Sequence, residues 1–147
     1  MKSYKSTHMI RYEDLNHHGN LYAGRAIEWM MESSFIAAEL AYGDREGLLY
    51  KNTHKFDFMK SVLPGDIVTY ESTIVRCGRT SLSMHISVID EATGEVRAEG
   101  YTTFVTVDPR DKRPVAHGLK LDATENPQEL RWRKEIDSFF SKKQEKK

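Results

Sequence analysis

The sequence has little cysteine and no long apolar run. Its one cysteine, Cys77, cannot close an internal disulfide, so we expect a protein of the reducing cytoplasm. No apolar stretch approaches the ~18 residues that a membrane-spanning helix needs. The first residues, Met1 to Lys5, are not followed by the apolar stretch of a signal peptide. These absences argue against a secreted protein and against a membrane partner.

The sequence also lacks net charge, because 22 Lys and Arg residues balance 22 Asp and Glu residues. A protein that coats nucleic acid would be strongly basic, so we expect no nucleic-acid partner. The charge is nevertheless uneven, since residues 131–147 carry seven basic and three acidic side chains and residues 1–130 are net acidic. At 147 residues the chain has the length of a single domain, which can bury a core without a disulfide or a metal.

The clearest predicted element is a helix over residues 23–42, which contains no proline and is followed by Gly43, a typical helix end. Apolar side chains occupy most of its circumference, which is typical of a buried helix. At ~100° per residue its charged side chains fall on one narrow stripe: Arg25, Glu28, Glu32 and Glu39. We therefore expect this helix at the centre of the fold.

Five segments rich in β-branched and aromatic residues predict strands over residues 6–12, 54–59, 66–75, 80–89 and 96–107. Short turn signals separate the last four, which implies antiparallel neighbours. Apolar and polar residues alternate along residues 81–89, so we expect that strand to bury one face. A strand, a long helix and four more strands predict an α+β fold, in which an antiparallel sheet packs on one buried helix.

A second helix is predicted near the end of the sequence. Asn126 suits the N-cap and Pro127 suits the first helical position. Apolar side chains then recur on one helical face: Trp132, Ile136, Phe139 and Phe140. We expect a main domain over residues 1–122 and, over residues 123–147, a C-terminal amphipathic helix with a basic, solvated tail.

Four short motifs follow one another between residues 8 and 118. The first, Asn-His-His-Gly at residues 16–19, precedes the start of the long helix, and the others are residues 56–66, 78–81 and 100–108. In order and spacing they resemble the hot-dog-fold acyl-CoA thioesterases, the acyl-CoA hydrolase and 4-hydroxybenzoyl-CoA thioesterase-like superfamily. The resemblance implies a hot-dog fold, in which a curled antiparallel sheet wraps around one long helix.

The same resemblance implies hydrolysis of an acyl-CoA thioester to a free acid and CoA. Coenzyme A then arrives as part of the substrate, and no separate cofactor is expected. It also implies a homo-oligomer: a dimer, a tetramer or a hexamer.

Thioester hydrolysis needs a site for the developing oxyanion and a base or nucleophile. The leading amides of the long helix lack intrahelical partners and lie at the positive end of its dipole, so they suit the oxyanion. The small residues Ala23 and Gly24 would let a thioester approach that backbone. The other interpretation of Gly24 is tight packing of the helix on the sheet.

Glu32 is the candidate base or nucleophile. Spacing alone favours a solvated side chain that pairs with Arg25 or Glu28. The resemblance instead implies that Glu32 faces a partner subunit. Our hypothesis is that it acts with Asn16 of that subunit, whose amide orients water or binds the thioester carbonyl. Many relatives carry an acid at the place of Met31, so the carboxylate here is shifted by one residue, ~100° around the helix.

The other candidate site residues are expected to bind the substrate rather than to take part in the reaction. Arg79 is the first choice for the CoA phosphates, with Lys60 as a second cation, and the hydroxyls of Thr80 and Ser81 suit the pantetheine amides. The alternative for Arg79 is a solvated side chain in a β-turn. His18 is an auxiliary site residue, and the histidine spacing does not fit a metal site.

Two other functions remain open from the sequence. One is a hot-dog hydroxyacyl dehydratase or enoyl hydratase, which would use His18 with Glu28 or Glu32. The other is a hot-dog protein that binds acyl-CoA without catalysis, because it lacks an acid at Met31. The Asn-His-His-Gly and Gly-Arg-Thr-Ser motifs favour the thioesterase over the dehydratase.

Overall fold

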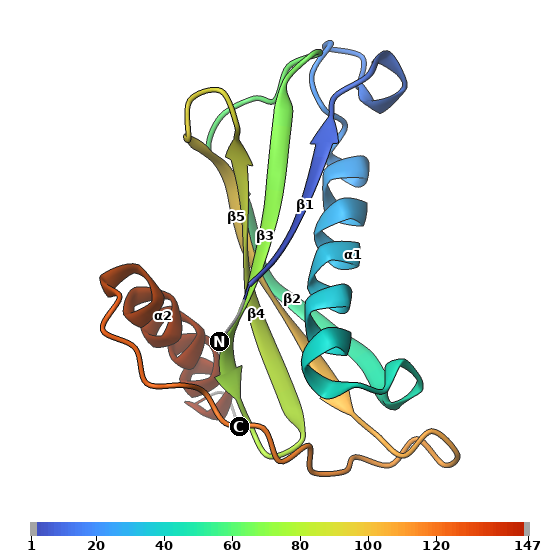
Figure 1. The fold of residues 1–147 in the computed structure, drawn as a ribbon, viewed down its shortest axis with the longest axis vertical. Helices are drawn as coiled ribbons and strands as arrows, with labels where there is room; N and C mark the ends of the chain where they lie inside the picture. The colour runs from blue at the N-terminus through green and yellow to red at the C-terminus, as the bar shows by residue number, and fades with distance from the viewer. Residues whose placement is uncertain (1–2, 146–147) are drawn as a thin grey trace.

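The computed structural model describes residues 3–145, with side chains through Ser141. Within this range one five-stranded antiparallel sheet has the strand order β1-β3-β4-β5-β2 (Figure 1). Its strands are β1 (Tyr4–Met9), β2 (Leu48–Phe58), β3 (Ile67–Cys77), β4 (Ser81–Asp90) and β5 (Val96–Thr106). This arrangement confirms the predicted α+β class. Because β1 and β2 are the outer strands, the sheet has two open edges.

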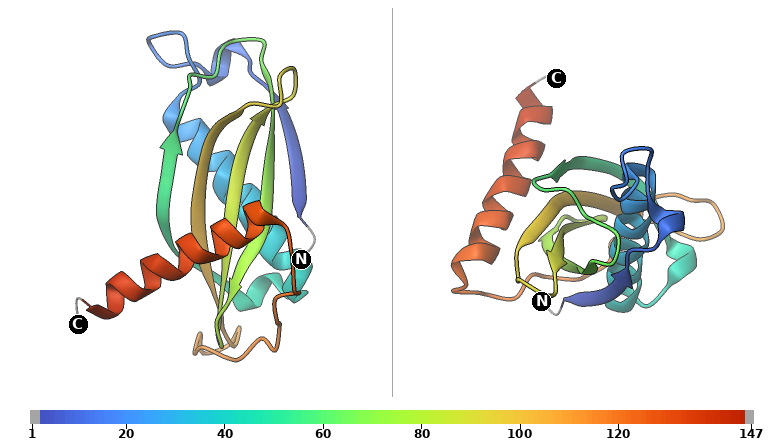
Figure 2. Two further views of the ribbon diagram at one scale, coloured as in Figure 1. Left: turned by 90° about the vertical axis from the view of Figure 1, so that its left-hand side faces the viewer. Right: turned by 90° about the horizontal axis from the view of Figure 1, so that it is seen from above.

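The long helix α1 (Ala23–Tyr42) has the predicted bounds and lies along one face of the sheet. Gly43 ends it with a left-handed φ of 86°, and its N–H donates to Glu39 O at 2.7 Å. That conformation is strained for residues with a Cβ, which explains the glycine. The sheet curls toward α1 when it is seen end-on (Figure 2).

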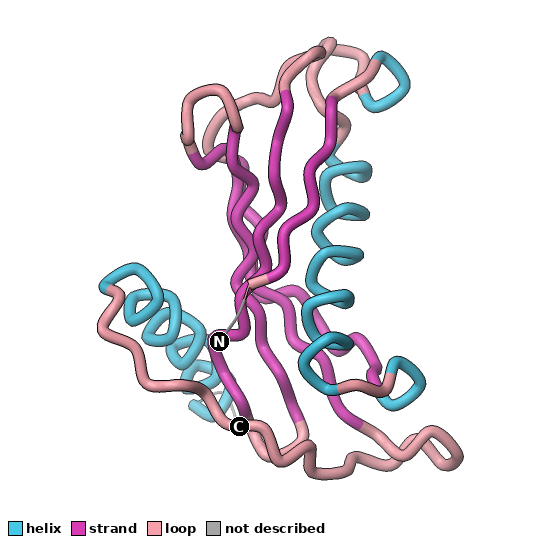
Figure 3. The backbone as a smooth tube through the Cα atoms, viewed as in Figure 1, coloured by secondary structure: helices cyan, strands magenta, loops and turns pink. Residues whose placement is uncertain are grey.

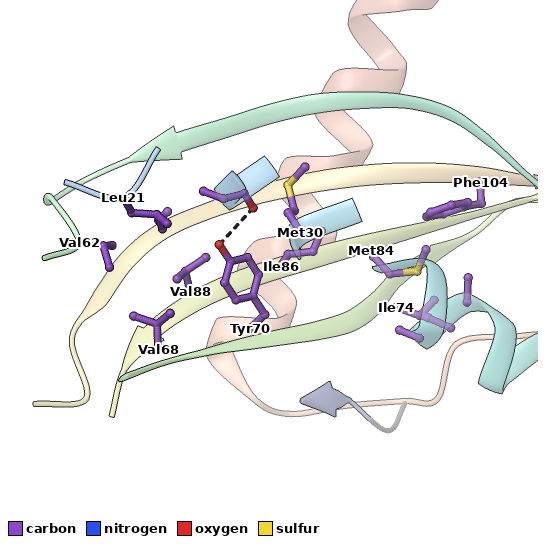
Figure 4. Packing of buried hydrophobic residues seen from close by; sticks show 14 of the residues in the cluster. Leu21, Met30, Val62, Val68, Tyr70, Ile74, Met84, Ile86, Val88 and Phe104 are labelled. Atoms are coloured by element: carbon purple, nitrogen blue, oxygen red, sulfur yellow. Dashed lines mark hydrogen bonds between the residues drawn. The ribbon is translucent and has the colours of Figure 1, made fainter. Parts of the chain in front are cut away.

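The main core fills the space between α1 and the sheet. Met30 of α1 is fully buried there beside Tyr70 and Ile86 (Figure 4), and Phe104 of β5 belongs to the same cluster. The Tyr70 hydroxyl donates to Ala26 O of α1 at 3.1 Å, and burial raises the pKa of Tyr70. The phenol therefore stays a neutral donor that satisfies a buried carbonyl.

The opposite side of α1 faces outward, which corrects the expectation of a helix enclosed on all sides. Ile27 is 43% exposed and Leu40 is 71% exposed. Five strands cover only one side of a helix, so the remaining apolar side chains stay open in a single chain. The polar stripe is confirmed, since Glu28 and Glu32 lie on this open side.

The second helix α2 (Pro127–Glu145) crosses the sheet on the face away from α1 (Figure 2). Asn126 caps it as predicted, because its Oδ1 accepts from the backbone N–H groups of Gln128 and Glu129 at 2.9 and 3.1 Å. Trp132 and Ile136 are buried against the sheet. Lys146 and Lys147 of the predicted basic tail lie outside the described residues.

Two strand predictions need correction. β2 begins at Leu48 rather than at residue 54, because register shifts after Tyr50 and Thr53 break the alternation that marks a strand. β4 buries both faces rather than one, since its polar side chains lie on the face that α2 covers: Ser83, His85 and Ser87.

The remaining segments are short or irregular. The first strand, predicted over residues 6–12, ends at Met9, and the 3-10 helix η1 (Tyr12–Asp14) follows it. A second 3-10 helix, η2 (Arg45–Gly47), follows α1. Residues 107–126 connect β5 to α2 around one end of the sheet (Figure 3). Neither described helix is long and apolar enough to cross a membrane.

Candidate functional site

A cavity of about 400 Å³ lies at the N-terminal end of α1. Its walls are the loop before α1, the first residue of α1, the end of β2 and the loop that follows β2. The lining residues are Asn16, Asn20, Leu21, Ala23, Phe58, Met59, Lys60, Ser61 and Val62. The Leu21 N–H donates to Val62 O at 2.8 Å, so backbone hydrogen bonding holds the two loops together. The cavity thus joins the first and second sequence motifs.

The Asn16 side chain is oriented by its own loop. Its Oδ1 accepts from the backbone N–H of His18 at 2.9 Å and of Asn20 at 3.2 Å. Gly19, with a φ of 80°, provides the left-handed turn that brings these amides back toward Asn16. Because the oxygen is engaged twice, the Nδ2 group, which makes no hydrogen bond within residues 3–145, is a donor for a ligand. Asn16 is therefore suited to bind a carbonyl oxygen.

The start of α1 has no side-chain cap. The N-cap residue Tyr22 accepts no hydrogen bond through its side chain, and Ala23 and Gly24 are exposed. The leading amides can therefore receive an anionic oxygen. The glycine has a local explanation too, since a Cβ on Gly24 would lie 2.5 Å from the Tyr22 ring. The close packing partner is therefore this ring.

Glu32 does not line the cavity. It lies on the exposed side of α1, and its field acts on His8 of β1. Burial lowers the pKa of His8, and the carboxylates of Glu32 and Asp14 partly oppose this shift. The proposed pairing of Glu32 with Arg25 is absent from the structure, because Arg25 contacts Asp14 at 3.3 Å and Glu28 at 3.4 Å.

The Met31 side chain contacts the edge strand β2. The Thr53 hydroxyl donates to its sulfur at 3.9 Å, and Tyr50 shares a hydrogen bond of 2.9 Å with that same hydroxyl. A thioether cannot accept a proton as a carboxylate does. Among the described residues of one chain, no carboxylate lines the cavity.

The histidine pair is also outside the cavity. The rings of His17 and His18 lie 3.9 Å apart, and both side chains are exposed. His18 thus contributes its backbone N–H to Asn16 rather than its imidazole to the cavity. No cluster of three side chains able to hold a metal is found among residues 3–145.

The candidate CoA-binding residues divide between two ends of the molecule. Lys60 lines the cavity, where its Nζ lies 2.6 Å from Glu95 Oε2. Glu95 lies just before β5, and nothing in the four motifs pointed to this contact. The neighbouring Arg97 also contacts Glu95, with Nε and Oε1 3.0 Å apart.

Arg79, Thr80 and Ser81 form the turn at the far end of β3. The eleven residues of β3 separate this turn from the Asn16 loop, roughly 30 Å at ~3.3 Å per residue. Thr80 O accepts from the Thr106 N–H at 2.8 Å, and His117 Nε2 lies 2.9 Å from Ser81 O. The turn is therefore held by its backbone, while the Arg79 side chain is exposed.

A curled antiparallel sheet on one long helix, with a cavity at the first turn of that helix, defines a hot-dog protein. Residues 18–97 match the sequence model of the Thioesterase superfamily. The chain belongs to this superfamily. The predicted family and fold are both confirmed.

The chain is also similar to individual proteins described as acyl-CoA hydrolases or thioesterases. An uncharacterized acyl-CoA thioester hydrolase, YkhA of Bacillus subtilis (strain 168), is 29% identical over 103 residues, which cover 67% of this chain. The match spans 59% of the length of that relative. A hexameric acyl-CoA thioesterase superposes with a TM-score of 0.84 at 22% identity, covering 98% of this chain and 92% of that one. An acyl-CoA hydrolase from Bacillus cereus superposes with a TM-score of 0.78 at 25% identity, covering 96% and 91%.

Proposed function

We propose that the protein is a homo-oligomeric acyl-CoA thioesterase, which hydrolyses an acyl-CoA thioester to a free acid and CoA. The observation that carries the proposal is the pairing of two donors at one cavity. The free Nδ2 group of Asn16 and the uncapped start of α1 at Ala23 both line it. Such donors stabilise the oxyanion that forms when a thioester carbonyl is attacked.

The base comes from a second copy of the chain. Glu32 and Arg79 lie away from the cavity of their own chain, so they can serve only a cavity of another chain. An antiparallel pair of copies would bring the Arg79 end of one chain to the Asn16 end of the other. The exposed Ile27 lies one helical turn before Met31, which contacts Thr53 of the open edge strand β2, and it gives such a pair an apolar contact.

The proposed reaction is a single displacement. The Glu32 carboxylate of one copy accepts a proton from water, and the resulting hydroxide attacks the thioester carbonyl held by Asn16 of the other copy. The carbon–sulfur bond then breaks, the acyl group leaves as the free acid, and the CoA sulfur takes back the proton held by Glu32 and leaves as the thiol. Lys60 and Arg79 bind phosphates at the two ends of the CoA-binding surface.

Release of free thiol from acyl-CoAs of graded chain length tests the activity. We expect turnover for at least one chain length, and a loss of roughly 10²-fold in kcat/KM when Asn16 or Glu32 is replaced. Unchanged kcat/KM in both Asn16→Ala and Glu32→Gln would overturn the assignment.

A mixing experiment tests the sharing of the site between copies. Asn16→Ala and Glu32→Gln should each be nearly inactive as pure oligomers. If the site is shared across a two-fold interface, a mixed pair has one intact site and one doubly altered site. Equal mixing and reassembly then restores roughly a quarter of wild-type activity. No recovery, with mixed pairs verified by mass, would place both residues in one chain's site or outside any site.

One observation favours a second candidate, a non-catalytic acyl-CoA-binding protein. No carboxylate among the described residues lines the cavity, and Met31 lies where many relatives are expected to carry an acid. Binding of CoA or acyl-CoA without thiol release, measured by calorimetry and the thiol assay together, would support this candidate instead.

A further inference from the structure

A histidine is fully buried on the opposite side of the sheet from the cavity. His85 of β4 is 0% exposed beneath α2. Its ring stacks on the Trp132 indole at 3.7 Å and an interplanar angle of 12°, and the edge of Tyr101 lies 5.0 Å away. Nε2 lies 3.0 Å from Glu99 Oε2, whereas Nδ1 is buried without a hydrogen-bond partner. Nothing in the proposed reaction uses this residue.

Charged groups face His85 from each neighbouring element that carries one. Glu99 comes from β5, and α2 contributes Glu135 and Arg131. Lys55 of β2 forms an ion pair with Glu135, with Nζ 2.8 Å from Oε1. The Tyr101 hydroxyl donates to the other Glu135 oxygen at 3.1 Å.

The strand on the other side, β3, places the buried Thr73 opposite His85. Its charged side chain on that face is Glu71, two positions from Thr73, and Glu71 lines a hollow with Trp132. The nearest anion is therefore Glu99, which already accepts a hydrogen bond from the neutral imidazole through Nε2. Burial lowers the pKa of His85, and the hydrogen bond to Glu99 opposes this effect.

A second proton on the imidazole would have no hydrogen-bond acceptor in this arrangement. It would sit on Nδ1, which makes no hydrogen bond and which the packing of α2 keeps from water. The Trp132 ring covers one face of the imidazole, so solvation of the protonated ring from the outer side of the sheet requires the Trp132 ring to move off it. Since Trp132 belongs to α2, that movement requires the helix to leave the sheet.

We propose that α2 is a pH-operated clamp, and that protonation of His85 releases this helix from the outer face of the sheet. In the released state the imidazole titrates at its ordinary pKa of about 6.5. In the docked state its pKa is lower, so docking has its full strength above about pH 6.5 and weakens as the pH falls toward the docked pKa. The docking equilibrium changes by at most about tenfold per pH unit in that window.

Hydrogen exchange of the intact protein, read by mass spectrometry between pH 7.5 and pH 5, tests the clamp. After correction for the intrinsic pH dependence of exchange, amides of α2 should lose protection as the pH falls while amides of α1 keep theirs. The variant His85→Gln should show α2 protection that does not change with pH. Equal loss in α1 and α2 would indicate global unfolding and overturn the proposal, as would the same pH dependence in His85→Gln.

Glu99→Gln gives a test that does not remove the buried ring. It takes away the anion that favours the protonated imidazole in the docked state, so the docked pKa falls further and the pH midpoint for α2 release should move upward. An unchanged or lower midpoint contradicts the proposal. These readouts are independent of the thioesterase assignment, because no α2 residue lines the cavity.

Discussion

The Asn16 side chain has two separable groups, because it lines the cavity with its oxygen bound to the loop and its nitrogen left as a donor. Asn16→Asp keeps both acceptor contacts to the amides of His18 and Asn20 but removes the donor. We expect kcat/KM for acyl-CoA hydrolysis to fall by roughly 10²-fold with little change in Tm. Asn16→Ala is the matched control, which should lose the same activity and also lower Tm. An Asn16→Asp enzyme of wild-type activity would show that the amide nitrogen is not used.

Glu95 limits how well Lys60 can bind an anion, since the two groups already form an ion pair with atoms 2.6 Å apart. A CoA phosphate must compete with this carboxylate for the ammonium group. Glu95→Gln should therefore lower KM several-fold, and Lys60→Met should raise it, each with kcat nearly unchanged. The double variant is the control: if Glu95 acts through Lys60, it should match Lys60→Met alone. A double variant with a KM as low as that of Glu95→Gln would show that Glu95 does not act through Lys60.

At the scale of elements, the helices were predictable because their signals are local. The Asn126-Pro127 start of α2 and the Gly43 end of α1 are signals carried by one or two adjacent residues. Both helices begin where the sequence predicts. The start of β2 was predicted six residues too late, because its bulges place consecutive residues outside a simple alternation. The polar face of β4 was predicted to be open, since nothing within that strand reveals that α2 covers it.

The Asn126 cap stabilises α2 by satisfying two backbone amides. Asn126→Ala removes that acceptor and should lower the free energy of unfolding by about 1 kcal/mol. The Tm should fall by about 2–4 °C for a chain of this size. Asn126→Asp keeps the acceptor and is the control, with an expected Tm close to wild type. Calorimetry distinguishes the two outcomes, and equal Tm values for Ala and wild type would show that the cap is not used.

At the scale of the whole molecule, the site could be predicted only in part. The first motif and Lys60 meet at one cavity, as the order of motifs suggested, because the loops before α1 and after β2 are tied by backbone hydrogen bonds. Glu32 and Arg79 do not join them in one chain. Their positions depend on sheet topology, which sets the length of β3 between Asn16 and Arg79, and on how two copies pack. Neither is encoded in the spacing of a motif.

The open side of α1 supplies the last prediction, because oligomerisation and activity should be lost together. Ile27 is 43% exposed, one helical turn before the Met31 contact with the edge strand β2. Fully burying such a side chain contributes roughly 1.5–3 kcal/mol, so the 43% of Ile27 that is still exposed would contribute a corresponding part of this, counted twice at a two-fold interface. Ile27→Lys replaces that gain with a charge that has no partner there, so the protein should dissociate into chains of 17.0 kDa.

Light scattering and thiol release on the same samples check this outcome. Leu130→Lys is the matched control, since Leu130 is also exposed, at 47%, but lies on α2 away from that side. It should leave both the oligomer and the activity unchanged. If Ile27→Lys remains oligomeric and active, the copies meet through a surface that does not include Ile27. If it dissociates yet keeps full activity, the site is complete within one chain and the shared-site mechanism is wrong.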